Sequence, residues 1–263
     1  MTDCTIITTI KNRREHFIKT FPFMLTQYGI PYEIVLVNYY SNDDLSELIE
    51  SKISSLRDTF SPFLRRIREI ELLEDLKFNP RKARNLGAAY CKKNTILSFS
   101  DVDVFLGMTY TSHWCKKVMK EKAFVATRRQ DTKAYSPGRL SPEINYGNFL
   151  VHCEDYYNIN GFDESISHYG GDDDDIYHRL KLSGLREINP YSEEEARQFS
   201  ILHGDDLRLK SMEVTHRMNA DEEFLRIYEN KNMFAKNNNF VNLEFIKTLS
   251  KEKTLYIKEE KDA

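Results

Sequence analysis

The sequence predicts an α/β fold with a mainly parallel sheet flanked by helices. Two observations predict it. In the first hundred residues, β-branched apolar runs alternate with segments of helical periodicity. Polar clusters also follow three of these runs directly, at 11–13, 38–44 and 101–103. Strands that alternate with helices form a Rossmann-like sheet, and such sheets bind ligands beyond the carboxyl ends of their strands.

The individual elements of the first half have clear signals. Runs such as "CTIITTI" and "TILSFS" predict four strands, at 4–10, 32–40, 66–72 and 95–100. Phe17, Phe21 and Met24 have helical spacing, and that helix ends near Pro31. A second helix follows Ser, Asn and Asp residues at 41–56. A third, at 79–94, begins with an Asn cap and a proline.

The second half of the chain is less regular. We expect strands at 123–129 and 144–152 and another within 196–206. Residues 221–238 have the pattern of a helix, and the charged segment 251–263 is expected to fray. No repeat or linker divides the 263 residues, so we interpret the chain as a single domain.

Composition excludes several classes of protein. The chain is 40% hydrophobic and 30% charged, which is typical of a soluble globular protein. A net charge of −3 gives no basic field for bulk nucleic-acid binding. No apolar run reaches the roughly 18–20 residues of a membrane span, and the N-terminus lacks a signal-peptide pattern. Four scattered cysteines, without a CxxC pair, favour reduced thiols in a cytoplasmic protein.

Asp101 and Asp103 come directly after the fourth predicted strand. Two carboxylates at this spacing can turn toward one hard cation, such as Mg²⁺ or Mn²⁺, that also bridges to phosphate oxygens. The alternative is a solvated turn between strand and loop.

Basic residues stand near the start of two predicted helices: Lys11 and Arg13 before the first, and Arg81, Lys82 and Arg84 in the third. Basic groups at a helix N-terminus suit a diphosphate. The alternative is an ordinary solvated first turn. Asn85 and Gly87 follow, and they either let the backbone approach a ligand or serve helix packing.

Four consecutive aspartates, 172–175, follow Gly170 and Gly171. The glycines permit unusual backbone angles, and "DDDDIYHRL" predicts the first turns of a helix, whose dipole favours carboxylates. Helix geometry cannot aim four successive side chains at one point. We therefore expect one or two of them to serve chemistry, for example as a general base, while the others cap the helix or face water.

Taken together, five segments resemble the beta-1,4-galactosyltransferase family and related bacterial capsule and chondroitin-type glycosyltransferases. They are "IITTIKNRREHF", "FNPRKARNLGAA", "LSFSDVDVF", "NINGFDE" and "YGGDDDDIYHRL", in the family's order. The resemblance runs from about residue 4 to about residue 220. It implies the GT-A fold, with a nucleotide-sugar-binding half at 1–105, an acceptor and catalytic half at 106–225 and a helical tail at 226–263.

By position in these motifs, the resemblance also implies roles for single residues. Asp173 matches the catalytic base, and Asp172 matches a glutamate of the acceptor-binding pair, while Asp174 and Asp175 support the helix or loop. Tyr169 stands where the family has a tryptophan that covers donor and acceptor. The donor-side matches are Lys11 and Arg13 on UDP, Phe78, Arg81 and Lys82 at the uridine and phosphates, and Asp101 with Asp103 on the metal. Thr9 replaces a proline of the family, which alters the UDP contact.

The remaining metal ligands of the family are a Met and a His three residues apart. Glu213 and His216 have that spacing here, and Glu in place of Met favours a harder ion such as Mg²⁺ over Mn²⁺. His203 is a rival ligand. Ile144 stands where the family selects its donor, and an aliphatic side chain there leaves room for an N-acetyl group, which indicates UDP-GalNAc.

The resemblance thus implies an inverting, metal-dependent transfer from a UDP-sugar, Gal or GalNAc favoured, to a saccharide hydroxyl. We expect an oligosaccharide or lipid-linked acceptor in bacterial surface polysaccharide synthesis. A cytoplasmic location is expected, at most peripherally at the inner membrane face. The alternative that the sequence is a catalytic domain from a longer, anchored chain stays open.

Two other functions fit parts of the sequence. "ILSFSDVDVF" also resembles the signature of haloacid-dehalogenase phosphatases, in which Asp101 is the nucleophile and Asp103 the acid. That signature usually stands near the N-terminus, whereas about 100 residues precede it here. The third possibility is a non-catalytic subunit that binds a nucleotide sugar.

Overall fold

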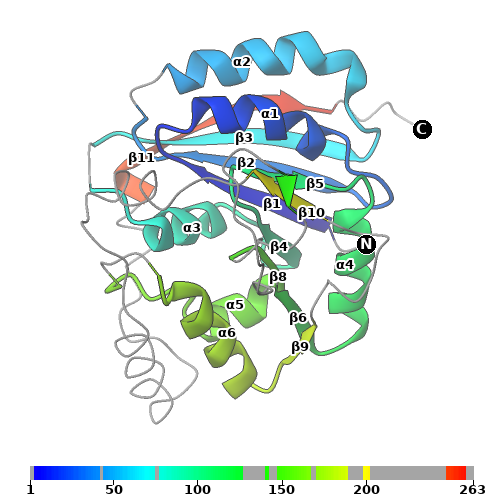
Figure 1. Ribbon diagram of the computed structural model, residues 1–263, viewed down its shortest axis with the longest axis vertical. Coiled ribbons are helices and arrows are strands. Elements are labelled where there is room, and N and C mark those ends of the chain that lie inside the picture. Colours follow the sequence, from blue (N-terminus) through cyan, green and yellow to red (C-terminus); the bar gives the residue numbers. More distant parts are fainter. Residues whose placement is uncertain are drawn as a thin grey trace.

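The computed structural model describes residues 3–41, 44–74, 77–126, 140–141, 147–166, 170–188, 198–201 and 247–258. An eight-stranded sheet runs through the molecule in the order β11-β3-β2-β1-β4-β8-β6-β9 (Figure 1). Its strands are β1 (Asp3–Ile10), β2 (Tyr32–Asn38), β3 (Leu64–Leu72), β4 (Thr95–Phe99), β6 (Ala123–Ala126), β8 (Phe149–His152), β9 (Arg186–Ile188) and β11 (Ser250–Ile257).

The four strands predicted in the first half are confirmed, and they pair in parallel as β3-β2-β1-β4. Strand β1 lies at the point where the chain order reverses, with β2 on one side and β4 on the other. Such a switch point is where ligands bind in open α/β sheets. The sheet is less parallel than expected in its second half, because β8 runs antiparallel to both β4 and β6.

Helices cover both faces of the sheet (Figure 1). One face is covered by α1 (Arg14–Leu25), α2 (Leu45–Leu56) and α4 (Tyr110–Lys120), and the other by α3 (Pro80–Ala89), α5 (Cys153–Asn158) and α6 (Asp172–Leu182). Alternate residues of β1 and β2 feed the two cores: Ile6 and Ile34 pack on the first side, and Ile7 and Val35 on the second. The expected three-layer α/β architecture is therefore confirmed.

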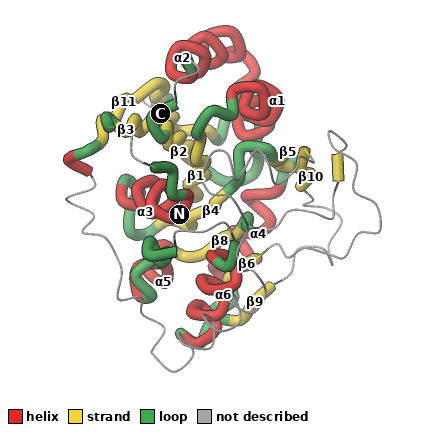
Figure 2. The backbone as a smooth tube through the Cα atoms, turned by 60° about the vertical axis from the view of Figure 1, so that its left-hand side comes forward, coloured by secondary structure: helices red, strands yellow, loops and turns green. Residues whose placement is uncertain are grey.

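A small second sheet, β5-β10-β7, lies near α1 and α4 (Figure 2), and its β5 packs in the core that these helices cover. It contains β5 (Val104–Leu106), β7 (Leu140–Ser141) and β10 (Gln198–Ile201). β10 confirms the strand expected within 196–206. Its Ile201 amide donates to the carbonyl of Asp103 at 2.8 Å, which ties the second half of the chain to the segment that carries both strand-end aspartates.

The expectation for the C-terminal segment was wrong. Residues 250–257 do not fray but form β11, which pairs antiparallel with β3 at the edge of the sheet. Charged side chains are well suited to an edge strand, and Glu252 pairs with Arg66 and Arg68 of β3. The Tyr256 ring packs edge-on against Phe60 at 5.0 Å. At least this part of the segment 226–263 is thus strand rather than helix.

Candidate active site

The strand-end aspartates are held at the carboxyl edge of β4. The amide of Ser100 donates to the carbonyl of Ile7 in β1 at 2.9 Å. The amide of Asp101 donates to Asn148 Oδ1 at 2.8 Å. The Asp101 side chain is 27% exposed, whereas Asp103 is buried. The Asp101 carbonyl also accepts from the amide of Val104 at 3.2 Å, so hydrogen bonds on both sides of Asp101 hold its backbone at the end of the sheet.

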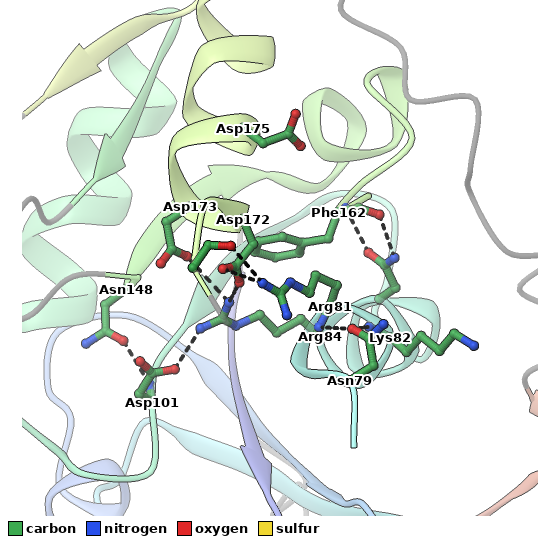
Figure 3. A network of polar contacts seen from close by, with 12 residues as sticks. Asn79, Arg81, Lys82, Arg84, Asp101, Asn148, Phe162, Asp172, Asp173 and Asp175 are labelled. Carbon is green, nitrogen blue, oxygen red and sulfur yellow. Dashed lines mark hydrogen bonds and ion pairs between the residues drawn. The ribbon is translucent and has the colours of Figure 1, made fainter. Parts of the chain in front are cut away.

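Helix α6 presents the second group of carboxylates. Gly170 and Gly171 precede it with φ of 106° and 74°, values that favour glycine. This turn places Asp172 and Asp173 at the first positions of α6. Asp175 instead points away from them (Figure 3) and pairs with Arg179 at 2.8 Å inside the protein. Asp175 thus supports the helix, as expected, whereas the chemical roles of Asp172 and Asp173 stay predictions.

Helix α3 supplies two arginines that meet these carboxylates. Its cap is the one predicted: Asn79 accepts hydrogen bonds from the amides of Arg81 and Lys82, and Pro80 opens the helix. Arg81 and Arg84 are three residues apart and share one face of the helix. Lys82 points away from the cluster (Figure 3). The Arg81 Nη2 atom donates to Asp172 Oδ1 at 2.8 Å and to the carbonyl of Gly170 at 3.1 Å.

Arg84 is the centre of the cluster (Figure 3). Its Nη2 donates to Asp101 Oδ1 at 2.8 Å, and its Nη1 lies 3.1 Å from Asp172 Oδ2 and 3.5 Å from Asp173 Oδ1. The guanidinium also lies over the Phe162 ring, 5.0 Å from its centroid. The carboxylates at the end of β4 and at the start of α6, 71 residues apart in sequence (172 − 101), therefore meet on one side chain.

Burial and charge shift the pKa of Asp173. Burial has the largest effect and the charge of Asp172 the next, and together they raise this pKa well above the ordinary aspartate value. Arg84 and Arg81 act in the opposite direction. A raised pKa makes Asp173 a stronger base than an exposed aspartate, which suits a group that accepts a proton.

Asn85 and Gly87 serve packing, the second of the two alternatives. Asn85 is fully buried, and its side chain bonds the backbone of Phe162 and Glu164 Oε1. A Cβ atom at Gly87 would lie 2.5 Å from Ile7 Cγ2, so helix α3 can rest this closely on β1 only with glycine there.

Other donor-side candidates lie at the ends of β1 and β2. Lys11 donates to the carbonyl of Tyr40 at 2.7 Å and lies over its ring. Arg13 is the N-cap residue of α1, and the half-buried Phe78 packs edge-on against Tyr39 at 5.2 Å. These positions confirm the predicted strand–helix junction. Roles toward a nucleotide stay predictions.

A divalent cation is compatible with the chemistry of this edge. Asp101 and Asp103 provide carboxylate oxygens, the ligands that Mg²⁺ and Mn²⁺ prefer. Within the described part of the chain, however, no group of three or more His, Cys, Asp or Glu side chains is placed to hold a metal. The predicted ligands Glu213 and His216 and the rival His203 lie outside the described residues, as do Ile144 and Tyr169.

Sequence reasoning missed two residues of the site. Asn148 is buried and accepts the Asp101 amide, while Gly147 has φ of 104° and leaves space beside Asp173. A Cβ at Gly147 would lie 3.1 Å from Asp173 Oδ2 and 3.4 Å from Arg84 Nη2. The available signal was a glycine within the strand predicted at 144–152, because glycine inside a strand often marks a close approach.

Comparison with known families gives one match. A family model described as the N-terminal domain of galactosyltransferase matches residues 132–203, which include Asn148, Asp172 and Asp173. A search of curated protein sequences found no significant match.

Comparison with solved structures shows the fold. TarS 1–349 from S. aureus, in complex with UDP-GlcNAc, is 13% identical, with 95% of this chain and 70% of that chain covered and a TM-score of 0.58. The mannosyltransferase PcManGT from Pyrobaculum calidifontis, in complex with GDP-Man and Mn²⁺, is 15% identical, with 71% and 54% covered and a TM-score of 0.55. The chain therefore spans about half of that mannosyltransferase.

These two matches confirm the expected GT-A type of fold. The catalytic domain of Drosophila β1,4-galactosyltransferase 7, in complex with xylobiose, is also similar, at 16% identity with 86% and 80% covered and a TM-score of 0.49. The fold and the family-model match together support a glycosyltransferase. Among the described helices, none is long and apolar enough to cross a membrane.

Proposed function

We propose that this chain is a metal-dependent, inverting glycosyltransferase that moves a hexose or N-acetylhexosamine from a UDP-sugar to a saccharide hydroxyl. The observation that carries the proposal is the meeting of Asp101, Asp172 and Asp173 on Arg84 at the carboxyl edge of the sheet. Open α/β sheets bind ligands at this edge, and a reaction between two bound substrates would use one group of carboxylates on the donor side and the other on the acceptor side.

The proposed roles follow from each residue's surroundings. Asp173, with its pKa raised by burial, accepts the proton of the acceptor hydroxyl as this attacks the anomeric carbon from the face opposite UDP. Both oxygens of Asp172 accept from arginines, so Asp172 orients the acceptor from a fixed position. A divalent ion held by Asp101 and Asp103 would neutralise the leaving diphosphate. Lys11 and Arg13, at the end of β1, would contact that diphosphate.

The donor is a UDP-sugar in this proposal, with Gal or GalNAc favoured. The family model names a galactosyltransferase, and the TarS structure contains UDP-GlcNAc. PcManGT contains Mn²⁺ with a different nucleotide sugar, which supports a metal but leaves Mg²⁺ as its alternative. For the acceptor we propose an oligosaccharide or lipid-linked saccharide of a bacterial surface polysaccharide, reached from the cytoplasm at the inner membrane face.

The phosphatase alternative is disfavoured by the fold. The solved structures that support the fold are glycosyltransferases, and about 100 residues precede Asp101, whereas the phosphatase signature usually stands near the N-terminus. The non-catalytic alternative stays a possible result of the test below.

The test is UDP release from UDP-Gal, UDP-GalNAc and UDP-GlcNAc, with Mn²⁺ or Mg²⁺, by the wild type and three variants. Asp103→Ala removes a proposed metal ligand, and Asp173→Asn removes the base at constant shape. Asp174→Asn is the matched control, because it makes the same chemical change one residue further along α6.

Metal-dependent release that is lost in the first two variants and kept in Asp174→Asn is the expected result. Losses of at least about 100-fold are expected for a general base. An α-linked donor should give a β-linked product, which NMR of the anomeric proton measures, and a retained configuration would contradict the mechanism. Metal-dependent UDP binding without turnover would favour the non-catalytic subunit, and release of phosphate from an aryl phosphate would favour the phosphatase.

A further inference from the structure

We propose that Arg84 is a positioning residue that ties the donor side of the site to its acceptor side. The inference rests on the proposed function, because it concerns where the base Asp173 stands relative to a donor bound beside Asp101. Arg84 acts through these two carboxylates and not on the substrates themselves.

The geometry of the guanidinium is that of a bridge. Nη2 faces the strand end through Asp101, and Nη1 faces the helix start through Asp172 and Asp173 (Figure 3). The planar fork of an arginine directs its two terminal nitrogens at a fixed angle, whereas a lysine offers a single point charge. The orientation of one side chain therefore fixes the separation of two elements, β4 and α6, that are otherwise connected through a long stretch of chain.

Arg84 has little freedom to move. Its side chain is 8% exposed, and its guanidinium lies over the Phe162 ring at 5.0 Å. The backbone of Phe162 is in turn held on both sides by Asn85 of the same helix. Packing against α3 and its neighbours thus holds the Arg84 side chain in place, and the three carboxylates lie around its guanidinium.

Arg81, unlike Arg84, is not seen to contact Asp101. Although it is fully buried and bonds Asp172, its described contacts are with Asp172 and the Gly170 carbonyl, both at the start of α6. Arg81 therefore fixes the helix start, while Arg84 alone among the described side chains contacts carboxylates of both elements. Without Arg84, like charges would face one another across the site and move apart.

Loss of Arg84 should therefore slow the chemical step more than it weakens donor binding. A displacement of about 1 Å in a catalytic group can lower a rate by about 100-fold. UDP is held by other groups in the proposal, Lys11 and Arg13 among them, and its affinity should depend little on this arginine.

The experiment compares Arg84→Ala, Arg84→Lys and Arg68→Ala with the wild type. Arg68 is a matched control: it is a buried arginine of β3 whose carboxylate partners are Glu33 at 3.0 Å and Glu252 at 3.2 Å. The measurements are the thermal unfolding midpoint, the Kd of UDP with Mn²⁺ by calorimetry, and kcat and KM for the UDP-sugar that the wild type turns over. Each kinetic series is repeated with added guanidinium at a non-denaturing concentration.

For Arg84→Ala we expect kcat to fall by at least about tenfold while the Kd of UDP stays within about threefold. Added guanidinium should restore part of kcat, and Arg84→Lys should give an intermediate kcat. Folded Arg68→Ala should keep its kcat and show no response to guanidinium, although its unfolding midpoint falls. Rescue is a response that a purely structural arginine would not give.

The inference is overturned if kcat of Arg84→Ala stays within about twofold of the wild type, or if the loss lies in the Kd of UDP instead of kcat. It is also overturned if guanidinium restores no activity. A wild type that turns over no nucleotide sugar overturns the proposed function, and this inference with it. An active wild type with unaffected Arg84 variants overturns the inference alone.

Discussion

Asn85→Ala should destabilise the fold severely, because this side chain uses all of its hydrogen-bonding capacity inside the protein. Nδ2 donates to the Phe162 carbonyl at 3.0 Å and to Glu164 Oε1 at 2.7 Å. Oδ1 accepts from the Phe162 amide at 3.0 Å and from the Tyr156 hydroxyl. Asn85 is fully buried, so alanine leaves four partner groups without their bonds.

The expected loss follows from this count. A net contribution of roughly 1 kcal/mol for each of four hydrogen bonds gives about 4 kcal/mol. Water that enters the space left by the amide would satisfy some partners and lower the loss to about 2 kcal/mol. Either value is a large part of the roughly 5–15 kcal/mol that stabilises a typical domain.

Urea unfolding followed by circular dichroism measures the effect as a shift of the midpoint at unchanged slope. Asn94→Ala is the control, because Asn94 is exposed in the turn before β4. A loss for Asn85→Ala below about 1 kcal/mol, or a loss no larger than that of the control, would refute the reasoning.

Three further predictions concern single side chains. Gly147→Ala should lower kcat by about tenfold and leave UDP affinity intact, since its Cβ would lie 3.1 Å from Asp173 Oδ2 at a positive φ; steady-state kinetics and calorimetry test this. Burial raises the pKa of Glu164 from 4.5 to about 7. The protonated form then stabilises the fold, and stability falls by up to about 3 kcal/mol as pH rises through this interval, but not in Glu164→Gln, as urea unfolding at both ends shows. Gly87→Ala, with its Cβ 2.5 Å from Ile7 Cγ2, should lower the unfolding midpoint at a cost of about 1–3 kcal/mol.

The first half of the fold could be predicted because its signals are local. The β-branched run of β1 and the Asn-Pro start of α3 act within a few residues of the element that they define. Strand β11 gave no such signal. Its charged residues are stable as a strand because β11 pairs with the edge strand β3, which provides two arginines for Glu252. These contacts depend on the tertiary structure and leave no local signal in the sequence.

In the candidate site, too, the sequence predicted the features that have local signals and not the contacts between distant segments. The strand end located Asp101 at the carboxyl edge of the sheet, and the Gly-Gly turn placed Asp172 at the start of a helix, but only the family resemblance implied that both belong to one site. The sequence placed Arg81 and Arg84 near the start of one helix, but it did not indicate which side chains they contact. Arg84 and Asp172 are 88 residues apart, and no periodicity in either segment encodes their contact. Asn148 was missed for the same reason.

The cluster at the site differs in its charges from the buried pair of Arg179 and Asp175, which lies within α6. At the site, the two guanidiniums of Arg81 and Arg84 face three carboxylates. Burial, and after it the charge of Asp172, raises the pKa of Asp173, and burying these charges costs stability. An apolar cluster would hold α6 on α3 at a lower cost in free energy, so stability alone does not account for this arrangement. The proposed function would account for it, because it binds a cation beside Asp101 and transfers a proton to Asp173.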